Sequence, residues 1–384
     1  MSSAQPTPAT RLFFADWLRI GAFGLLVLYH VGMLYVPWAF HVKQLPTYAA
    51  LEPWMRLTNP WRMSLLFMVS GLATGLMLGR DGLLRQRTRR LMLPLLLGVA
   101  VIVPPQAWLQ VREQFGYTGG YLEFLLRYYS ADQGFCRNGH CLVLPTWNHL
   151  WFLPYLWCYT ALLLAAWRWW PTASRQRAAN ALAQARGTAL LLVPIIVLGA
   201  TRALLLPRFG VTHALVDDPW AHATYGPLFA VGVLLGRRQR LLMAFEALRW
   251  PALALALLAW AVQAFAPPTE GAARVALRFV VATQQWGALV AAFGFAHRHL
   301  NRDHRWRAPL TEAVFPLYLV HQTIIIIAAV ALRPWALPAA WEALVLVVLT
   351  AAGGLLAWQV ACRLPPLRVW LGLSPAPRAA GGTG

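Results

Sequence analysis

The chain is poor in acidic residues. Aspartate and glutamate number 13 against 33 lysines and arginines, and charged residues make up only 12% of the 384 positions. Soluble domains carry about twice that share of charge. The acidic residues stand in predicted loops or at the ends of apolar segments, whereas ion-coupled transporters and proton relays usually depend on acids within the membrane. The composition therefore excludes an ordinary soluble domain and argues against ion-coupled transport.

Several common catalytic signatures are also missing. The sequence has no GxSxG nucleophile elbow, no HExxH helix and no Walker phosphate-binding loop. Serine hydrolase, zinc protease and ATPase activities therefore have no support.

Long apolar segments are the main feature that is present. Hydrophobic residues account for 59% of the chain. The first segment is too long, and too rich in tryptophan and tyrosine, for a cleaved signal peptide. We predict an all-α polytopic membrane protein, a bundle of about ten transmembrane helices. The expected segments are 16–38, 61–79, 91–111, 149–170, 188–206, 220–236, 250–266, 277–297, 312–332 and 342–362.

The basic residues predict the orientation of the bundle. The two tails and the even-numbered loops hold about twice as many lysines and arginines as the other loops, which places both termini in the cytoplasm. The net charge of +20 then fits contact with anionic lipids, without any need for nucleic acid. We expect one integral-membrane domain over 16–372, a cytoplasmic tail over 1–15 and a disordered cytoplasmic tail over 373–384.

A histidine and an arginine share one face of the first segment. His30 follows Arg19 by about three helical turns, so their side chains point in similar directions, roughly 16 Å apart along the axis. Ionisable residues at such depth mark functional pathways by default. We interpret His30 as a base near mid-membrane, below a cytoplasmic mouth marked by Arg19.

The loop from Arg80 to Arg90 holds five arginines. These side chains could clamp the phosphates of a nucleotide-bearing donor, or they could only hold the loop in the cytoplasm. Just before the loop, Gly71, Gly75 and Gly79 recur every four residues, which predicts a face for close helix packing.

Three further polar residues lie in apolar segments, each with two interpretations. His149 opens the fourth segment and His321 lies near mid-depth in the ninth, where either could be catalytic or could only hydrogen-bond a neighbouring helix. Arg202 could snorkel outward or hold an anionic part of a substrate.

Two of the four cysteines fall in the longest external loop. Cys136 and Cys141 could form a small disulfide if the loop faces the periplasm. Two cysteines and one histidine fall short of a four-ligand metal site, and we predict no metal.

Several motifs in order resemble the membrane acyltransferase-3 family. They are Arg19-x10-His30, FMVSGLATG followed by Arg87-x-x-Arg90 and Pro94, HLWFL, and FPLYLVHQ. HVGMLYVPWAFHV, WRMSLLFMVSG, TRRLMLP and RLPPLRVWL are similar to its glucan biosynthesis protein C branch, whose members succinylate periplasmic glucans. The resemblance covers about residues 11–372, and it departs at Gln322, where that branch often has a second histidine.

The resemblance implies an O-acyltransferase of the bacterial inner membrane. It implies a donor, cytoplasmic acyl-CoA, a glycan acceptor on the far side, a bundle of about ten helices, and no permanently bound cofactor. The family's catalytic pair corresponds to Arg19 and His30, and its RxxR pair to Arg87 and Arg90, which would bind coenzyme A. The branch is also similar at four residues that we assign to the substrate: His41, His149, Arg202 and His321.

The chemistry of a sugar hydroxyl favours a base. Neutral His30 would take the hydroxyl proton during attack on the thioester, and either direct transfer or an acyl-enzyme intermediate fits the sequence. Succinyl is the favoured acyl group, with Arg202 as partner of its carboxylate, and acetyl is the next candidate. A passive flippase or exporter of a lipid-linked glycan is the alternative function, and a non-enzymatic assembly partner is a third.

Overall fold

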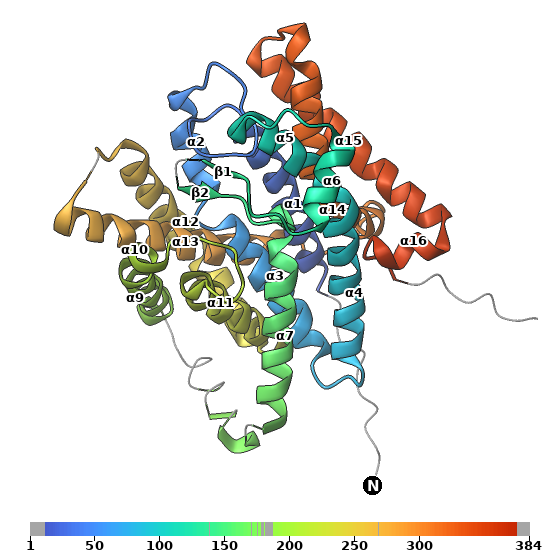
Figure 1. Cartoon of the computed structure of the whole chain (residues 1–384). Coiled ribbons are helices and arrows are strands. Elements are labelled where there is room, and N and C mark those ends of the chain that lie inside the picture. Colours follow the sequence, from blue (N-terminus) through green and yellow to red (C-terminus); the bar gives the residue numbers. More distant parts are fainter. Residues whose placement is uncertain are drawn as a thin grey trace, which may run out of the picture.

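The computed structural model describes residues 12–137, 139–169, 171–174, 176, 177, 180, 187–267 and 269–374. The described chain is helical apart from one two-residue ladder (Figure 1). Its helices are α1 (Phe13–Gly32), α2 (Glu52–Thr58), α3 (Arg62–Met77), α4 (Leu83–Leu97), α5 (Pro104–Phe115), α6 (Tyr121–Tyr129), α7 (Phe152–Trp169), α9 (Thr188–Leu204), α10 (Leu206–Phe209), α11 (Pro219–Arg237), α12 (Gln239–Phe265), α13 (Gly271–His299), α14 (Arg307–Leu332), α15 (Ala339–Arg363) and α16 (Pro365–Trp370). The shorter elements are the strands β1 (Cys136–Arg137) and β2 (His140–Cys141), the π-helix η2 (Gly98–Ile102), and the 3-10 helices η1 (Ala49–Leu51), η3 (Asn148–Trp151) and η4 (Arg333–Trp335).

Every expected apolar segment coincides with a helix or with a bent helix pair. Within the described residues, seven helices are long and apolar enough to cross a membrane, or up to eight if the bent pair α4–α5 is one span. Helices α3 and α11, which we also expected to cross, are not among the seven. Residues 1–11 and 375–384, most of the two expected tails, lie outside the described residues.

The bend between α4 and α5 has a local cause. The two helices meet at 46° after the π-helical turn η2. Pro104 and Pro105 begin α5, and proline cannot donate the backbone hydrogen bonds that would continue the preceding helix. The bend brings Gln106, in the first turn of α5, into the buried interior next to α14.

Helices α3 and α11 make an unusually close contact at glycines. A Cβ atom on Gly71 would lie 2.1 Å from the carbonyl oxygen of Phe229, and Gly75 and Gly232 show similar clashes with backbone atoms. Only glycine permits this approach of two backbones. The predicted packing face is therefore confirmed for Gly71 and Gly75. Gly79 lies beyond the end of α3 at φ +99°, and a Cβ atom added there would meet no neighbour within 4 Å, so it is not part of the contact.

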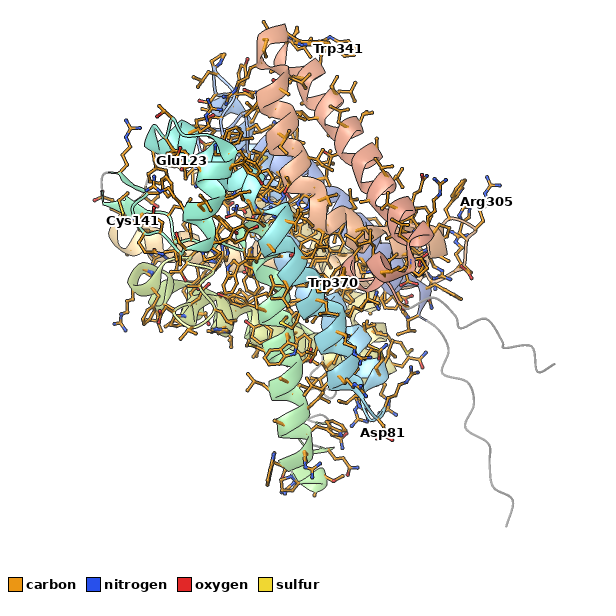
Figure 2. The ribbon with its side chains drawn as sticks, turned by 45° about the vertical axis from the view of Figure 1, so that its right-hand side comes forward. Asp81, Glu123, Cys141, Arg305, Trp341 and Trp370 are labelled. Carbon is orange, nitrogen blue, oxygen red and sulfur yellow. A yellow bond between two sulfur atoms is a disulfide. The ribbon has the colours of Figure 1, made fainter. Side chains whose placement is uncertain are left out.

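The arginine-rich loop and the cysteine pair lie far apart in the molecule. Figure 2 shows Asp81, in the loop before α4, near the lower end, and Glu123 and Cys141 toward the upper end. Cys136 and Cys141 form a disulfide across the β1–β2 ladder, so one of the two alternatives for this pair holds. Cys158 and Cys362 are free.

Candidate active site

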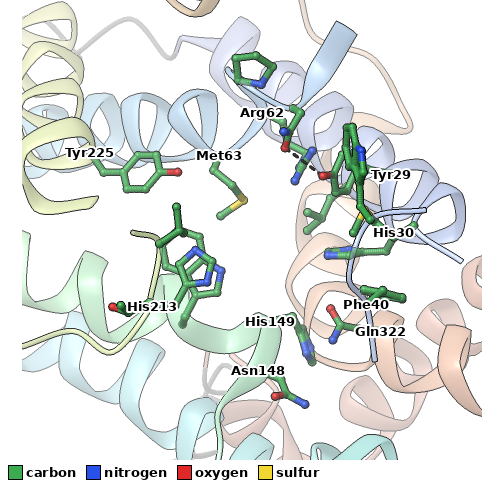
Figure 3. Close-up of a pocket in the computed structure, with 18 of the residues that line it drawn as sticks. Tyr29, His30, Phe40, Arg62, Met63, Asn148, His149, His213, Tyr225 and Gln322 are labelled. Carbon is green, nitrogen blue, oxygen red and sulfur yellow. Dashed lines mark hydrogen bonds between the residues drawn. The ribbon is translucent and has the colours of Figure 1, made fainter. Parts of the chain in front are cut away.

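A cavity of about 670 Å³ lies among α1, α3, α11 and η3 (Figure 3). Four of the predicted site residues line it: His30, His41, His149 and Arg202. His321 is fully buried and lies in contact with His30. The structure thus brings together five residues from five different parts of the sequence.

A chain of hydrogen bonds fixes the proton positions on His30 and His321 when both rings are neutral. The Nδ1 atom of His321 lies 2.7 Å from the carbonyl oxygen of Tyr318, which can only accept, so Nδ1 carries the proton. The Nε2 atom of His321 is then an acceptor, and it lies 3.0 Å from Nδ1 of His30. Nδ1 of His30 therefore donates, and its Nε2 keeps a lone pair.

The free nitrogen of His30 belongs to a ring that borders the cavity. Figure 3 shows the His30 side chain projecting into the space between Arg62 and His149. No described residue forms a hydrogen bond with Nε2 of His30. Phe40 stacks against the ring with centroids 6.0 Å apart, which fixes its orientation. The arrangement can accept a proton from a group that enters the cavity.

A second network holds His149 in place. Its Nε2 donates to the carbonyl oxygen of Leu319 at 2.9 Å. Gln106 donates from Nε2 to Thr323 at 3.0 Å, and Gln322 donates to Oε1 of Gln106 at 2.8 Å. Gln322, the departure from the glucan branch, therefore belongs to this amide network. Its side-chain amide supplies a donor without adding another titratable group.

His41 lies at the edge of the cavity, in the loop after α1. Its Nδ1 is 2.6 Å from Oε1 of Gln110, which can only accept, so Nδ1 donates. Burial lowers the pKa of His41 below the ordinary value, so the ring is neutral at neutral pH. Its ring packs against Phe40 with centroids 5.1 Å apart. His41 thus supports the residue that stacks on His30.

Arg202 reaches the cavity from α9. It donates from Nη2 to Oε1 of Gln285 at 3.3 Å, and its guanidinium carbon lies 5.4 Å from the ring centre of Trp220. Both neighbours are uncharged, so neither neutralises the arginine. No aspartate or glutamate stands among the described residues that line the cavity.

Part of the cavity wall is formed by tryptophans. Trp38, Trp147, Trp151 and Trp220 all line the cavity. His213 stacks on Trp151 with centroids 4.1 Å apart. Burial lowers the pKa of His213 to about 4, so this ring is also neutral at neutral pH. Flat aromatic faces suit the carbon-bound hydrogens of a sugar ring.

Arg19, Arg87 and Arg90 form a separate cluster in the other half of the bundle. The charge of Arg90 acts on both Arg19 and Arg87, so the three are neighbours. Arg19 is partly neutralised by Asp16 at 3.7 Å, while Arg87 donates to the hydroxyl of Thr74 at 2.9 Å. The Nε atoms of Arg19 and Arg87 are enclosed without an acceptor in the described part of the chain.

A second cavity, of about 510 Å³, borders this cluster. Arg85, Arg89 and Arg90 line it, together with Ser374 near the end of the described chain. Arg90 is thus the residue that joins the buried arginine cluster to an open basic cavity. Such a surface is suited to phosphate groups.

The sequence did not single out two residues of the first cavity's surroundings. Gln106 is a polar residue inside an expected apolar segment, and this feature could have identified it as a candidate site residue. Arg62 lies at the start of the expected segment 61–79, where an arginine usually indicates only topology. Its burial depends on the packing of α3 against α1, which no local pattern reveals.

Comparison with known proteins identifies one family. The family model described as an acyltransferase domain, Acyl_transf_3, matches residues 12–359, nearly the whole chain. No curated protein and no solved structure matches.

Proposed function

The chain belongs to the acyltransferase-3 family, and we propose that it moves an acyl group from cytoplasmic acyl-CoA to a glycan hydroxyl outside the bacterial inner membrane. Membership of the family makes the protein an acyltransferase. The observation that supports the site is the lone pair of His30, held toward a cavity by the hydrogen bond to His321.

The proposed topology has both termini in the cytoplasm and about ten membrane crossings, with α3 and α11 as short crossings inside the bundle. The basic loops support this orientation. The disulfide supports it independently, because disulfides persist in oxidising compartments and this one lies far from the arginine-rich loop. The cavity near η3 then opens toward the periplasm.

Acyl-CoA is proposed to bind through Arg19, Arg87 and Arg90. Three neighbouring arginines with one carboxylate among them, and with two Nε atoms that have no acceptor in the described chain, favour a ligand that brings negative charge, and the phosphates of coenzyme A do so. Arg19 and His30 are separated by roughly 16 Å along α1. The pantetheine arm is long enough to extend from the arginine cluster toward His30.

His30 is proposed to act as the general base in a direct transfer. A sugar hydroxyl donates its proton to Nε2 of His30 while its oxygen attacks the thioester carbonyl. Such a base contributes about 10²–10⁴-fold to the rate. His321 is a positioning residue, because it keeps the proton of His30 on Nδ1. His149 and His41 are proposed to orient the acceptor and the ring of Phe40.

The acceptor is proposed to be a periplasmic glucan or another surface glycan. The tryptophan wall supports a sugar ligand. Succinyl is the first candidate for the acyl group, because Arg202 lines the same cavity without a carboxylate partner. Acetyl is the second, and Arg202 would then contact only the acceptor.

The test uses purified protein in nanodiscs with labelled acetyl-CoA or succinyl-CoA and a β-glucan acceptor. The wild type is expected to label the glucan, and His30→Ala to lose transfer while still binding coenzyme A. His299→Ala, at an exposed histidine, is the matched control and should match the wild type. Equal transfer by wild type and His30→Ala would contradict the role of His30. Glycan translocation without acyl transfer would favour the flippase instead.

A further inference from the structure

The first turn of α3 opens onto the cavity that contains His30. Asn59, Pro60, Arg62 and Met63 all line this cavity. The N-cap residue, Trp61, forms no side-chain cap. Within the described chain, the backbone N–H groups of Arg62, Met63 and the following serine have no hydrogen-bond acceptor. A helix N-terminus with free N–H groups attracts negative charge.

The side chain of Arg62 adds an uncompensated charge at the same place. Arg62 is only 7% exposed, and its Nε and Nη1 atoms are enclosed without an acceptor in the described residues. Its guanidinium carbon lies 3.3 Å from the ring centre of Tyr29, a partner without formal charge. Burying a cation without a neighbouring anion costs free energy, so an unpaired buried arginine points to a ligand that supplies the negative charge.

The other cavity arginines have conventional partners. Arg56 forms an ion pair with Glu52 at 2.8 Å, and Arg202 donates to the amide of Gln285. Arg62 differs from both, since its guanidinium interacts with the uncharged Tyr29, and its Nε and Nη1 atoms have no acceptor among the described residues. The guanidinium therefore keeps donors for a group that enters the cavity.

Tyr29 connects this charge to the base. It precedes His30 on α1, and the two ring centres are 5.9 Å apart. Its hydroxyl donates to Asn59 at 3.0 Å, which ties α1 to the segment before α3. Figure 3 shows Arg62 and His30 on the same side of the cavity, and the charge of Arg62 acts on the His30 ring.

We propose that Arg62, with the free N–H groups at the start of α3, forms the oxyanion site of the transfer reaction; this assignment rests on the proposed function. As the sugar oxygen bonds to the carbonyl carbon, the hydroxyl proton passes to Nε2 of His30. The carbonyl π electrons move to the carbonyl oxygen, where Arg62 and the N–H groups donate to the developing negative charge. When the carbonyl re-forms, the carbon–sulfur bond breaks. Protonated His30 then returns the proton to the sulfur, so the products are the ester and free coenzyme A.

The role requires that Arg62 act on every donor equally, because the oxyanion is the same for each acyl group. Removing one donor from an oxyanion site typically lowers kcat by about 10²–10³-fold. Arg62→Gln should therefore lower kcat to that extent with both acetyl-CoA and succinyl-CoA, while the KM for each donor changes little. Arg62→Lys, which retains the charge but not the fork of donors, should recover part of the loss.

The experiment compares Arg62→Gln, Arg62→Lys, Arg62→Ala and the control Arg298→Gln in nanodiscs, with thermal unfolding and coenzyme A binding to verify the fold. Added guanidinium ion should raise kcat of Arg62→Ala, a rescue that a merely structural role would not produce. Arg298→Gln, which removes an exposed arginine paired with Glu246 away from the cavity, should stay within a few-fold of the wild type.

The possible outcomes distinguish failure of the oxyanion assignment from failure of the proposed acyltransferase function. A loss confined to succinyl-CoA and expressed in KM would make Arg62 a carboxylate-binding residue and overturn the oxyanion assignment. Unchanged kcat in a folded Arg62→Gln protein would overturn it as well. A wild type without transfer would overturn the proposed function, and the oxyanion assignment with it.

Discussion

The histidine network and the arginine cluster differ in how their buried polar groups are paired. Around His30, the described hydrogen bonds run from ring to ring and end on backbone carbonyls, so the histidines are held in defined neutral forms. Around Arg90, the cations outnumber their partners, and two Nε atoms are enclosed without an acceptor in the described chain. The histidine network is held in place without a ligand, whereas the arginine cluster keeps donors for an anion. This contrast supports our proposal of chemistry in the first region and donor binding in the second.

The largest effect should come from removing the lone pair of His30. His30→Gln can still hydrogen-bond but cannot take a proton, so kcat should fall by about 10²–10⁴-fold. The KM for acyl-CoA should stay within a few-fold, because the arginine cluster is untouched. Steady-state transfer assays at several donor concentrations measure both. A change in KM with unchanged kcat would reverse the assignment of the two regions.

The second prediction concerns the arginine cluster, where a substitution removes one positive charge. Arg90→Gln should raise the KM for acyl-CoA by roughly ten- to a hundredfold, as expected for loss of a charge-assisted hydrogen bond of about 1.5–3 kcal/mol. Its kcat should change little. Isothermal titration with coenzyme A checks the affinity directly, with the exposed Arg305→Gln as control. Equal affinities of Arg90→Gln and wild type would remove Arg90 from the donor site.

A smaller effect should follow from loss of the acceptor behind His30. His321→Ala should lower kcat by about tenfold or somewhat more, because His30 would then divide its proton between two nitrogens. His321→Gln, whose amide oxygen can accept from Nδ1 of His30, should lose less. Nitrogen NMR shifts of labelled histidine report the tautomers. A single unchanged tautomer in His321→Ala would contradict the positioning role.

The smallest effect concerns pH and the fold of the outer region. Burial lowers the pKa of His213 to about 4 from 6.5, so the folded protein binds fewer protons than the unfolded chain between these values. The stabilising contribution is present above pH 6.5 and is lost as the pH falls through 4. The unfolding temperature of His213→Gln should therefore depend less on pH in this window than that of the wild type. Parallel curves would show that His213 does not titrate as proposed.

Much of this architecture follows from local patterns, and the rest depends on contacts between distant residues. Apolar runs predicted the helices, and four-residue spacing predicted the packing face at Gly71 and Gly75. The pattern failed at Gly79, where the helix has already ended. Helices α3 and α11 are not among the candidate spans, and α3, with 16 residues, is the shorter of the two.

Some residues of the candidate site are likewise revealed by local sequence patterns, and others only by contacts between distant residues. His30 stood out because an ionisable residue in an apolar run is rare. Its partner His321 was a candidate, but their contact joins residues 291 positions apart and has no local signature. Arg62 did not stand out in the sequence, because an arginine at a predicted helix end usually indicates only which side of the membrane that end faces. Only the packing of α1 on α3 shows that its Nε and Nη1 atoms are enclosed without an acceptor among the described residues.

The glycine contact between α3 and α11 also limits how the molecule can move. Gly71 and Gly75 lie against the backbone of α11, and Gly232 and Gly236 lie against the backbone of α3, so each helix fits into the surface of the other. The next position at which glycines could meet is four residues along, a step of about 6 Å. A smaller sliding motion would bring side chains into the backbone contact. The start of α3, where Asn59 and Arg62 line the cavity, is thereby held in register with α11.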